Sequence, residues 1–220
     1  MPTVLITGAS RGIGREFGHQ YAEAGWRVIA TCRDPQAAGL EDALAMDVAS
    51  QLDVEDVASQ LAGEPIDLLI NNAGISAASG QAFGSFDYDD WERVLRVNTI
   101  APIRIAEAFA DNVAGSERKL MVFLSSILGS IAEGSGGSYT PYGTSKAALN
   151  AAMKGISGDL GARGITCISV HPGWVQTDMG GAGAAIDVRT SVSGLRQVID
   201  GLGPGDNGHF FDYTGRVLPW

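Results

Sequence analysis

The sequence contains a tyrosine and a lysine whose spacing would suit proton transfer. Tyr142 and Lys146 lie four residues apart at the start of a segment that we expect to be helical from 142 to 162, so both side chains would lie on one helical face. The same face carries apolar residues, which indicates that it turns toward the core: Leu149, Met153, Ile156 and Leu160. A buried ammonium group is costly without partners, so a chemical role would explain its position.

The chemistry that this pair could support is acid–base catalysis at a carbonyl group. A free tyrosine has a pKa near ~10, and we expect the positive charge of Lys146 to favour the phenolate. Tyr142 would then donate a proton to a carbonyl oxygen, or accept one in the reverse reaction. Such pairs also occur by chance, so the assignment depends on other motifs. Tyr139 is expected to be a pocket wall or a surface aromatic residue.

A glycine-rich turn near the start of the chain could bind phosphate groups. The apolar run 3–7 leads into Thr7-Gly8-Ala9-Ser10-Arg11-Gly12-Ile13-Gly14, and a helix is expected over 12–24. The glycines remove side chains that would block a pyrophosphate, and the start of the helix presents free N–H groups and the positive end of its dipole. This position between a strand and a helix favours dinucleotide binding over a plain structural turn.

These motifs together resemble the short-chain dehydrogenase/reductase family. The glycine spacing, Asn71-Asn72-Ala73-Gly74 and the Tyr142/Lys146 pair all match it, and the resemblance extends along essentially the whole chain. It implies hydride transfer between a nicotinamide cofactor and a carbonyl or alcohol substrate. Four stretches look most similar to the carbonyl reductase branch that includes sniffer-type and C-factor-like proteins: residues 125–131, 145–150, 171–181 and 218–220.

The resemblance implies a set of residues that would hold the cofactor. Asn72, Ala73 and Gly74 would support the sheet and line the adenosine side, and Asp47, followed by Val48, would contact the adenine ring. Lys146 would grip the nicotinamide ribose, and the main chain of Val175 and the Thr177 hydroxyl would hold the carboxamide. The full expected set is Gly8, Ser10, Arg11, Gly12, Ile13, Gly14, Arg33, Asp47, Val48, Asn72, Ala73, Gly74, Tyr142, Lys146, Pro172, Gly173, Val175 and Thr177.

The charges around the end of the second expected strand favour NADP over NAD. Enzymes that use NAD place an acidic residue there to bind the ribose 2′-hydroxyl, but this position holds Cys32, followed by Arg33. With Arg11 in the glycine loop, two guanidinium groups could bind a 2′-phosphate. We expect Asp34, before Pro35, to belong to a turn. The alternative is that both arginines are solvated surface charges.

Two further catalytic residues are implied by the family. Its Ser-Ser-x-x-Gly pattern selects Ser126, with Gly129 as the glycine, to hydrogen-bond the substrate oxygen. Ser130 is the alternative, because the distance from Ser126 to Tyr142 is longer than usual, although an expected flexible loop at 134–138 could hold the excess. Ser125 should point to the opposite side.

The second of these residues, Asn98, lies within a long expected helix, 88–113, four residues before Pro102. Proline has no N–H to donate to the Asn98 carbonyl, which predicts a kink. In the family this asparagine holds a water that connects to the lysine; a purely structural kink is the alternative.

The sequence also argues against other kinds of catalytic chemistry. His171 precedes Pro172 at the end of an expected strand, and we interpret it as structural because Tyr142 already fills the role of general base. No cluster of His, Cys or acidic residues has metal-ligand spacing, so no metal is expected. No Gly-x-Ser-x-Gly motif is present, which counts against a hydrolase.

The pattern of apolar runs predicts the fold that must position these residues. Apolar runs alternate with amphipathic stretches, which predicts a single doubly wound α/β domain over 1–220: a parallel Rossmann-type sheet of about seven strands with helices on both faces. Strands are expected at 3–7, 27–31, 43–46, 66–70, 119–124 and 165–170, and helices at 12–24, 53–61, 88–113, 142–162 and 191–201, with the last leading into 208–212.

Composition limits the possible partners. The 220 residues carry a formal net charge of −10, which would repel nucleic acid, and no apolar run reaches the ~18 residues of a membrane span. With two cysteines, expected to be reduced, and no signal peptide, a cytoplasmic protein is expected.

Two further features bear on substrate and assembly. Only residues 180–189 separate Thr177 from the last helical region, which suggests an open pocket for bulky or loosely selected substrates. Small residues on the 142–162 helix suggest a homodimer or homotetramer, with a monomer as the alternative: Ala147, Ala148, Ala151, Ala152, Gly155 and Gly158. We expect an NADP-dependent carbonyl reductase; the alternatives are an NAD-dependent alcohol dehydrogenase and an NADP-binding regulatory protein with vestigial catalysis.

Overall fold

A parallel sheet of seven strands forms the centre of the molecule, with the order β3-β2-β1-β4-β5-β6-β7. The computed structural model describes residues 1–40, 42–79, 81–133 and 139–220. The strands are β1 (Thr3–Thr7), β2 (Arg27–Cys32), β3 (Leu44–Ala45), β4 (Leu68–Asn71), β5 (Leu120–Leu124), β6 (Thr166–His171) and β7 (Phe210–Asp212). The strand order reverses between β1 and β4, so the expected doubly wound, Rossmann-type fold is confirmed.

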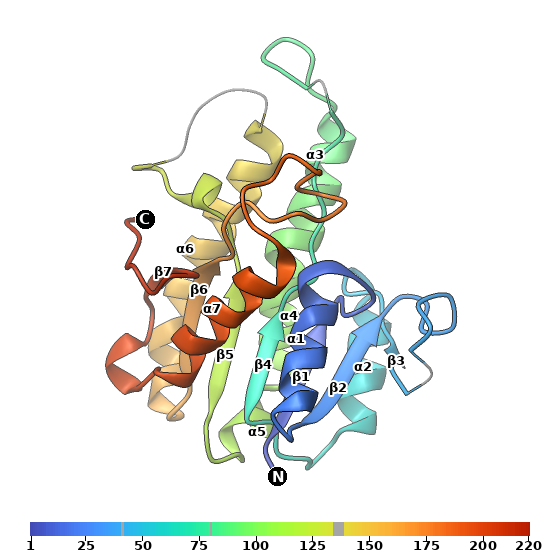
Figure 1. Ribbon diagram of the computed structural model, residues 1–220, viewed down its shortest axis with the longest axis vertical. Coiled ribbons are helices and arrows are strands. Elements are labelled where there is room, and N and C mark those ends of the chain that lie inside the picture. The colour runs from blue at the N-terminus through green and yellow to red at the C-terminus, as the bar shows by residue number, and fades with distance from the viewer. Residues whose placement is uncertain (41, 80, 134–138) are drawn as a thin grey trace.

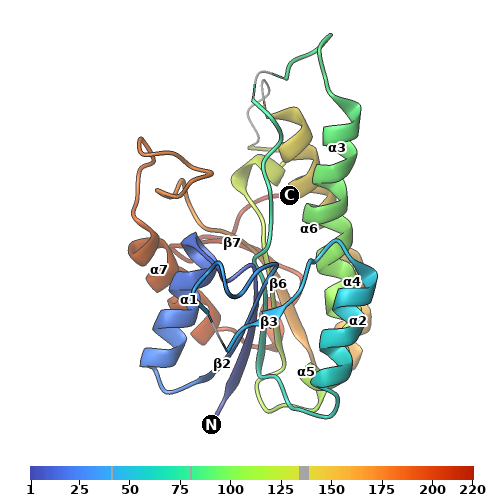
Figure 2. The same cartoon turned by 90° about the vertical axis from the view of Figure 1, so that its right-hand side faces the viewer.

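Helices cover both faces of this sheet (Figures 1 and 2). Helices α1 and α7 lie on one face, and α2, α4, α5 and α6 lie on the other, with α3 extending beyond the sheet. The helices are α1 (Gly12–Glu23), α2 (Gln51–Gln60), α3 (Tyr88–Leu95), α4 (Ala101–Ala108), α5 (Ala110–Ala114), α6 (Thr140–Ala162) and α7 (Val188–Asp200). Short turns of π- or 3₁₀-helix are η1 (Arg96–Ile100), η2 (Ile127–Gly129) and η3 (Pro204–Asp206).

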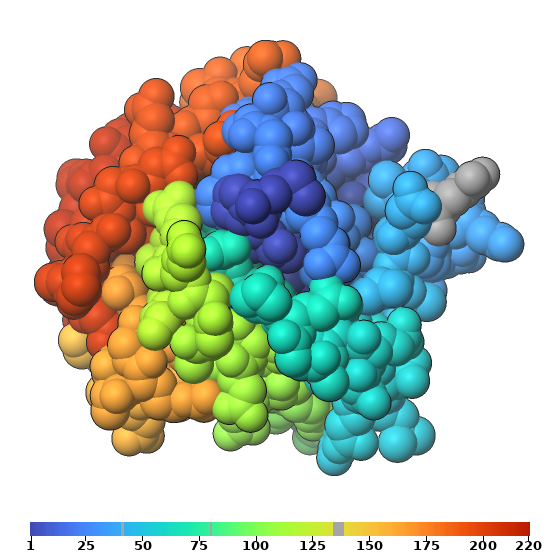
Figure 3. Space-filling model, turned by 90° about the horizontal axis from the view of Figure 1, so that it is seen from below, coloured from blue at the N-terminus to red at the C-terminus, as the bar shows by residue number. Residues whose placement is uncertain are grey.

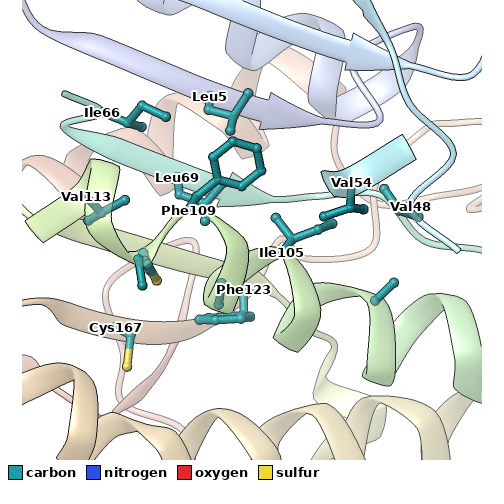
Figure 4. Packing of buried hydrophobic residues seen from close by; sticks show 14 of the residues in the cluster. Leu5, Val48, Val54, Ile66, Leu69, Ile105, Phe109, Val113, Phe123 and Cys167 are labelled. Atoms are coloured by element: carbon teal, nitrogen blue, oxygen red, sulfur yellow. The ribbon is translucent and has the colours of Figure 1, made fainter. Parts of the chain in front are cut away.

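The central strands are buried along their whole length because both of their faces are covered. All residues of β1, β4 and β5 are buried, as expected for a parallel sheet between two helical layers. One core cluster packs the sheet against α2, α4, α5 and α6, with Leu5, Leu69, Phe109 and Phe123 near its centre (Figure 4). A second cluster packs the other face against α1 and α7. Because the strands are parallel, their carboxyl ends all lie at the same end of the sheet.

The segment expected as a single helix over 88–113 is divided into several parts. Helix α3 passes into the π-helical turn η1, which contains Asn98, and α4 follows with Pro102 in its first turn. An interruption beside Asn98 is therefore confirmed, but the single helix is wrong, since the chain also leaves helical geometry at Phe109 before α5. A missing proline N–H favours such a rearrangement of the hydrogen bonds.

Other boundaries shift by a few residues, and capping explains two of the shifts. Ser50 accepts a hydrogen bond from the N–H of Asp53, and Asp187 accepts one from Thr190, so α2 and α7 begin earlier than expected. Helix α1 ends before Gly25, which has a φ of +77°, as expected for a glycine at this position. The expected flexible loop at 134–138 lies outside the described residues.

The two ends of the sheet differ in what they carry. The first residues of the chain lie near the middle of the end where the strands begin (Figure 3). The loops after the strands gather at the opposite end, together with the starts of α3 and α6 (Figure 1). In the described part of the chain, no helix has the length and apolar character needed to cross a membrane.

Candidate active site

The glycine loop joins β1 to α1 in a conformation that other residues would not tolerate. Gly8 and Gly12 have φ values of +69° and +55°, a region that L-residues with side chains rarely adopt. A Cβ atom at Gly14 would overlap the side-chain nitrogen of Asn72 and the carbonyl oxygen of Gly8. The loop therefore exposes main chain where a side chain would otherwise lie.

The start of α1 is electrostatically suited to an anion. Within the described residues, no side chain caps this helix, and its first turn contains no acidic residue. By contrast, α2, α3 and α7 are capped by Ser50, Asp87 and Asp187. The N–H groups at the start of α1 thus remain available for a phosphate group, and the residues present fit a dinucleotide.

The segment after β4 is bonded to this glycine loop. The side-chain nitrogen of Asn72 donates to the carbonyl oxygens of Thr7 (2.8 Å) and Gly8 (3.0 Å). The Thr7 hydroxyl accepts hydrogen bonds from the N–H groups of Asn72 and Ala73, each at 3.1 Å. Thr7 thus joins two motifs that the sequence analysis treated separately, and nothing in the sequence distinguished it from other strand residues.

The residues expected near the adenosine end lie around the ends of β2 and β3. Cys32 is buried and Arg33 is exposed. Asp34 accepts a hydrogen bond from the N–H of Ala37 (2.9 Å), so it does belong to a turn. Asp47 accepts a bond from the N–H of Ala49 (2.9 Å); the next residue, Val48, is buried in the core.

Arg11 already forms an ion pair with Asp178, which lies on the segment after β6. Its guanidinium group lies 2.6 Å from the carboxylate of Asp178, and both side chains are about three-quarters exposed (74% each). An exposed pair of this kind contributes about 0–1 kcal/mol. Arg11 can therefore exchange Asp178 for a phosphate group at little cost.

Ser126 and Tyr142 meet at the carboxyl end of β5. Ser126 is the N-cap residue of η2, and its hydroxyl accepts a hydrogen bond from the N–H of Leu128 (3.2 Å). The Ser126 hydroxyl also lies close enough to the Tyr142 hydroxyl to lower its pKa. Ser130, the alternative, donates instead to the main-chain oxygen of Trp220 (3.1 Å). The hydroxyl of Ser125 is buried and has no hydrogen-bond partner among the described residues.

Lys146 is buried beside Tyr142 on α6. Its ammonium nitrogen donates to the carbonyl oxygen of Leu124 (2.7 Å) and lies 5.7 Å from the centre of the Tyr142 ring. Burial lowers the pKa of Lys146 to about 8. Burial also raises the pKa of Tyr142 to about 12, although the neighbouring Ser126 hydroxyl acts in the opposite direction. The expectation that Lys146 lowers the Tyr142 pKa is therefore not met, because desolvation has the larger effect.

Asn98 connects this pair to the segment after β4. Its side chain is fully buried; the amide nitrogen donates to the carbonyl of Ile75 (2.8 Å) and to the hydroxyl of Ser145 (3.0 Å), and the amide oxygen accepts from the N–H of Ile75 (2.9 Å). Ser145 in turn donates to the carbonyl of Tyr142 (2.7 Å). A Cβ at Gly74 would lie 3.3 Å from the Asn98 oxygen and 3.6 Å from the Lys146 nitrogen. Ser145 is part of the stretch 145–150 that resembles the family, but the sequence assigned it no role of its own.

The segment after β6 completes the edge of the site. Gly173 has a φ of +85°, and the Ser191 hydroxyl, from α7, donates to the carbonyl of Pro172 (2.6 Å). Val175 is buried, and the Thr177 methyl group would lie 3.4 Å from a Cβ at Gly12. The sequence analysis also missed Ser191, because its contact with Pro172 exists only in the folded chain.

His171, which precedes this segment, is only partly buried. Burial lowers its pKa to about 4, so its imidazole is neutral at physiological pH. Its Nδ1 atom is buried and has no hydrogen-bond partner among the described residues. The structure therefore places it at the edge of the site without a bond to Tyr142 or Lys146 in the described part of the chain.

Comparisons with known proteins agree with this arrangement. A sequence model of the family described as short chain dehydrogenase matches residues 2–185. The chain is 42% identical to the protein named C-signal from Myxococcus xanthus over 156 residues, which cover 71% of this chain and 93% of that protein.

Solved structures match over the whole chain. Carbonyl reductase Sniffer of D. melanogaster is 34% identical, with a TM-score of 0.92 and full coverage of both chains. An NADPH-bound carbonyl reductase from chicken fatty liver is 31% identical, with a TM-score of 0.91 and coverage of 100% of this chain and 99% of that chain.

Proposed function

The chain belongs to the short-chain dehydrogenase family, and we propose that it reduces a carbonyl compound with NADPH. One observation carries this proposal: Ser126, Tyr142 and Lys146 lie together at the end of the sheet where the strands finish, and the uncapped start of α1 lies at the same end. Ligands of open α/β sheets bind at this end. The groups proposed to bind the cofactor and those proposed to transfer the proton therefore lie at the same end of the sheet.

The main chain of the glycine loop would hold the pyrophosphate of NADPH. Arg11 and Arg33 would bind the 2′-phosphate, and Asp47 would contact the adenine. The turn at Pro172 and Gly173, with Val175 and Thr177, would bind the nicotinamide end. When bound, NADPH supplies the hydride. Similarity to an NADPH-bound carbonyl reductase supports this choice of cofactor.

Tyr142 would deliver the proton. With a pKa raised to about 12, its phenol is protonated at physiological pH and can donate to a carbonyl oxygen. Ser126 would hydrogen-bond the same oxygen, since its hydroxyl already lies beside that of Tyr142. Lys146 would bind the nicotinamide ribose, and Asn98 would anchor the proton relay. Holding the reacting groups together supplies a large part of the rate.

Tyr142 could serve the reaction in either direction, since its phenol donates a proton during reduction and its phenolate accepts one during oxidation. An NAD-dependent alcohol dehydrogenase is the weaker assignment because Arg11 and Arg33 suit the 2′-phosphate of NADP. A second candidate is a regulatory NADP-binding protein; the 42% identity to the protein named C-signal favours it.

The substrate that we propose is an apolar or aromatic carbonyl compound of moderate or large size. Trp174 and Met179 are 59% and 50% exposed on the segment after β6, and Tyr139 is 62% exposed just before α6. Only a short loop, 180–187, separates this segment from α7. A tightly closed complex with a small substrate would contradict this assignment.

We also propose that residues 1–220 act as one catalytic domain in the cytoplasm. Small residues on the outer face of α6, including Ala151, Gly155 and Gly158, are exposed. They would allow close contact with a second copy in a homodimer or homotetramer. These residues lie on α6, the helix that also carries Tyr142 and Lys146.

The experiment that tests the proposed function compares wild type with Tyr142→Phe. NADPH consumption is measured with a panel of aldehydes, ketones, diketones and quinones. We expect turnover on some members, and a fall in kcat of about 10³-fold in the variant, with the Kd for NADPH and the melting temperature almost unchanged.

Tyr88→Phe serves as the matched control, because Tyr88 is exposed at the start of α3. Equal turnover by wild type and Tyr142→Phe would refute the role of Tyr142. Tight NADPH binding without turnover of any panel member would instead favour the regulatory candidate.

A further inference from the structure

The last residues of the chain form a short segment that lies outside the 2–185 range matched by the family model. We call residues 216–220 the Trp220 strap. It returns antiparallel to β7: Val217 forms a bridge with Phe211, and the N–H of Leu218 donates to the carbonyl of Phe210 (2.7 Å). Leu218 is buried, with 3% of its surface exposed. The strap is therefore fixed to the edge of the sheet.

Trp220 bonds to residues that are distant in the sequence. Its main-chain oxygen accepts hydrogen bonds from the N–H groups of Ile131 (2.7 Å) and Ala132 (3.2 Å) and from the hydroxyl of Ser130 (3.1 Å). Its ring stacks on the buried ring of Phe210, with centres 5.6 Å apart and planes inclined by 15°. Three donors thus converge on one oxygen, which the stacked ring holds in place.

A charged pair adds a second connection between the same two segments. Arg216 lies 3.5 Å from the carboxylate of Glu133. The pair is partly exposed, so it stabilises the contact only weakly. Together with Trp220, it connects the strap to residues 130–133 at both ends.

Residues 130–133 continue directly from the turn that bears Ser126. Within η2, the N–H of Gly129 donates to the Ser126 carbonyl (2.8 Å), and the N–H of Ser130 donates to the Ile127 carbonyl (2.9 Å). Residues 130–133, which follow η2, form neither a helix nor a strand. Movement of residues 130–132 would therefore pass directly to the main chain of Ser126.

The opposite side of η2 is held by α6. A Cβ at Gly129 would lie 2.8 Å from the carbonyl carbon of Lys146, so the two backbones are in close contact. The side chain of Asn150 donates to the Gly129 carbonyl (3.3 Å). The turn is thus fixed by α6 on one side and by the strap on the other.

We propose that the Trp220 strap is a positioning element for the reaction: it fixes the main chain of residues 130–132 and, through η2, the hydroxyl of Ser126 beside Tyr142. This inference rests on the proposed function. The strap touches neither cofactor nor substrate in this role. It acts on catalysis because small displacements of a group that orients the substrate reduce the rate steeply.

The test compares Trp220→Ala with Trp220→Phe and Val217→Ala. Trp220→Ala removes the stacking on Phe210, and we expect kcat for carbonyl reduction to fall about 10-fold, with the Kd for NADPH unchanged. Trp220→Phe keeps an aromatic ring and should restore most of the rate. Val217→Ala is the matched control, because its side chain is 56% exposed on the same segment. Ser130→Ala removes one donor and should give a smaller loss.

Hydrogen exchange provides a measurement that does not depend on turnover. In Trp220→Ala, the amides of 128–132 should exchange faster, while those of the glycine loop, 8–14, should be unchanged. Equal exchange of 128–132 in both proteins would overturn the inference, as would faster exchange without any loss of kcat. If wild type reduces no carbonyl compound, the proposed function fails, and the exchange result alone then decides whether the strap holds this turn.

Discussion

The two halves of the candidate site are built from different parts of the polypeptide. Around the glycine loop, the groups that face the expected cofactor are main-chain atoms, exposed by Gly8, Gly12 and Gly14. Around α6, they are buried side chains, of which Lys146 and Asn98 are 4% and 0% exposed. The first half depends on the absence of side chains, and the second depends on their exact environment.

This difference follows from the chemistry that each half would perform. A pyrophosphate is bound by N–H groups and a helix dipole, which any sequence supplies if nothing blocks it. A proton donor requires one particular functional group in a solvent-poor site that sets its pKa. Substitutions should therefore affect binding and stability in the first half, and the rate or its pH dependence in the second.

The largest effect that would sharpen this comparison is expected from Gly14→Ala. The new Cβ would overlap Asn72 and the Gly8 carbonyl, so the loop must move, at a cost of about 1–3 kcal/mol. We expect NADPH to bind up to about 100-fold more weakly and the melting temperature to fall, as measured by fluorescence titration and thermal unfolding.

Gly18→Ala, on the same helix, is the control, since the nearest atom to a Cβ there is a methyl carbon of Val28 at 3.8 Å. It should stabilise α1 by about 0.5–1 kcal/mol. If Gly14→Ala retained normal NADPH binding, the loop would tolerate a side chain, and the comparison between the halves would fail.

The pH dependence of the second half should be the next largest effect. Burial lowers the pKa of Lys146 to about 8, so its ammonium is charged below pH 8 and becomes neutral above it. If that charge assists reduction, kcat/KM should be level below about pH 8 and fall by up to about tenfold per pH unit above it.

Lys146→Arg tests the assignment, because arginine stays protonated across this range. The variant should be slower at pH 7, but its profile should stay flat to at least pH 10. A wild-type profile with no decline between pH 8 and 10 would show that deprotonation of Lys146 does not control the rate.

The smallest effect is expected at the adenosine end. Arg11→Ala and Arg33→Ala should each raise the KM for NADPH by about tenfold, the loss of roughly one charge-assisted hydrogen bond, with little change for NADH. Arg15→Ala is the control, as Arg15 is exposed on α1. Equal effects on both cofactors would mean that neither arginine binds the 2′-phosphate.

Much of the first half could be predicted because its signals are local. The strand, the glycines and the helix follow one another within residues 3–23. Each of these signals depends only on residues that are neighbours in the sequence. The catalytic pair is also local, as Tyr142 and Lys146 share one helix. The supporting residues were not predictable in this way: Thr7, Ser145 and Ser191 are ordinary polar residues until the chain brings them to Asn72, Asn98 and Pro172.

The sequence by itself determined the alternation of strands and helices, the position of the glycine loop and the residue types that could transfer a proton. These features depend on the periodicity of apolar residues, the conformational freedom of glycine and the identity of single side chains. Short stretches of sequence are enough to determine all three. Only the tertiary structure decided the direction of the Tyr142 pKa shift, the placement of Ser126 rather than Ser130 beside Tyr142, and the bonds of Trp220. Each of these depends on desolvation or contact between residues far apart in sequence, and both arise only when the layers pack together.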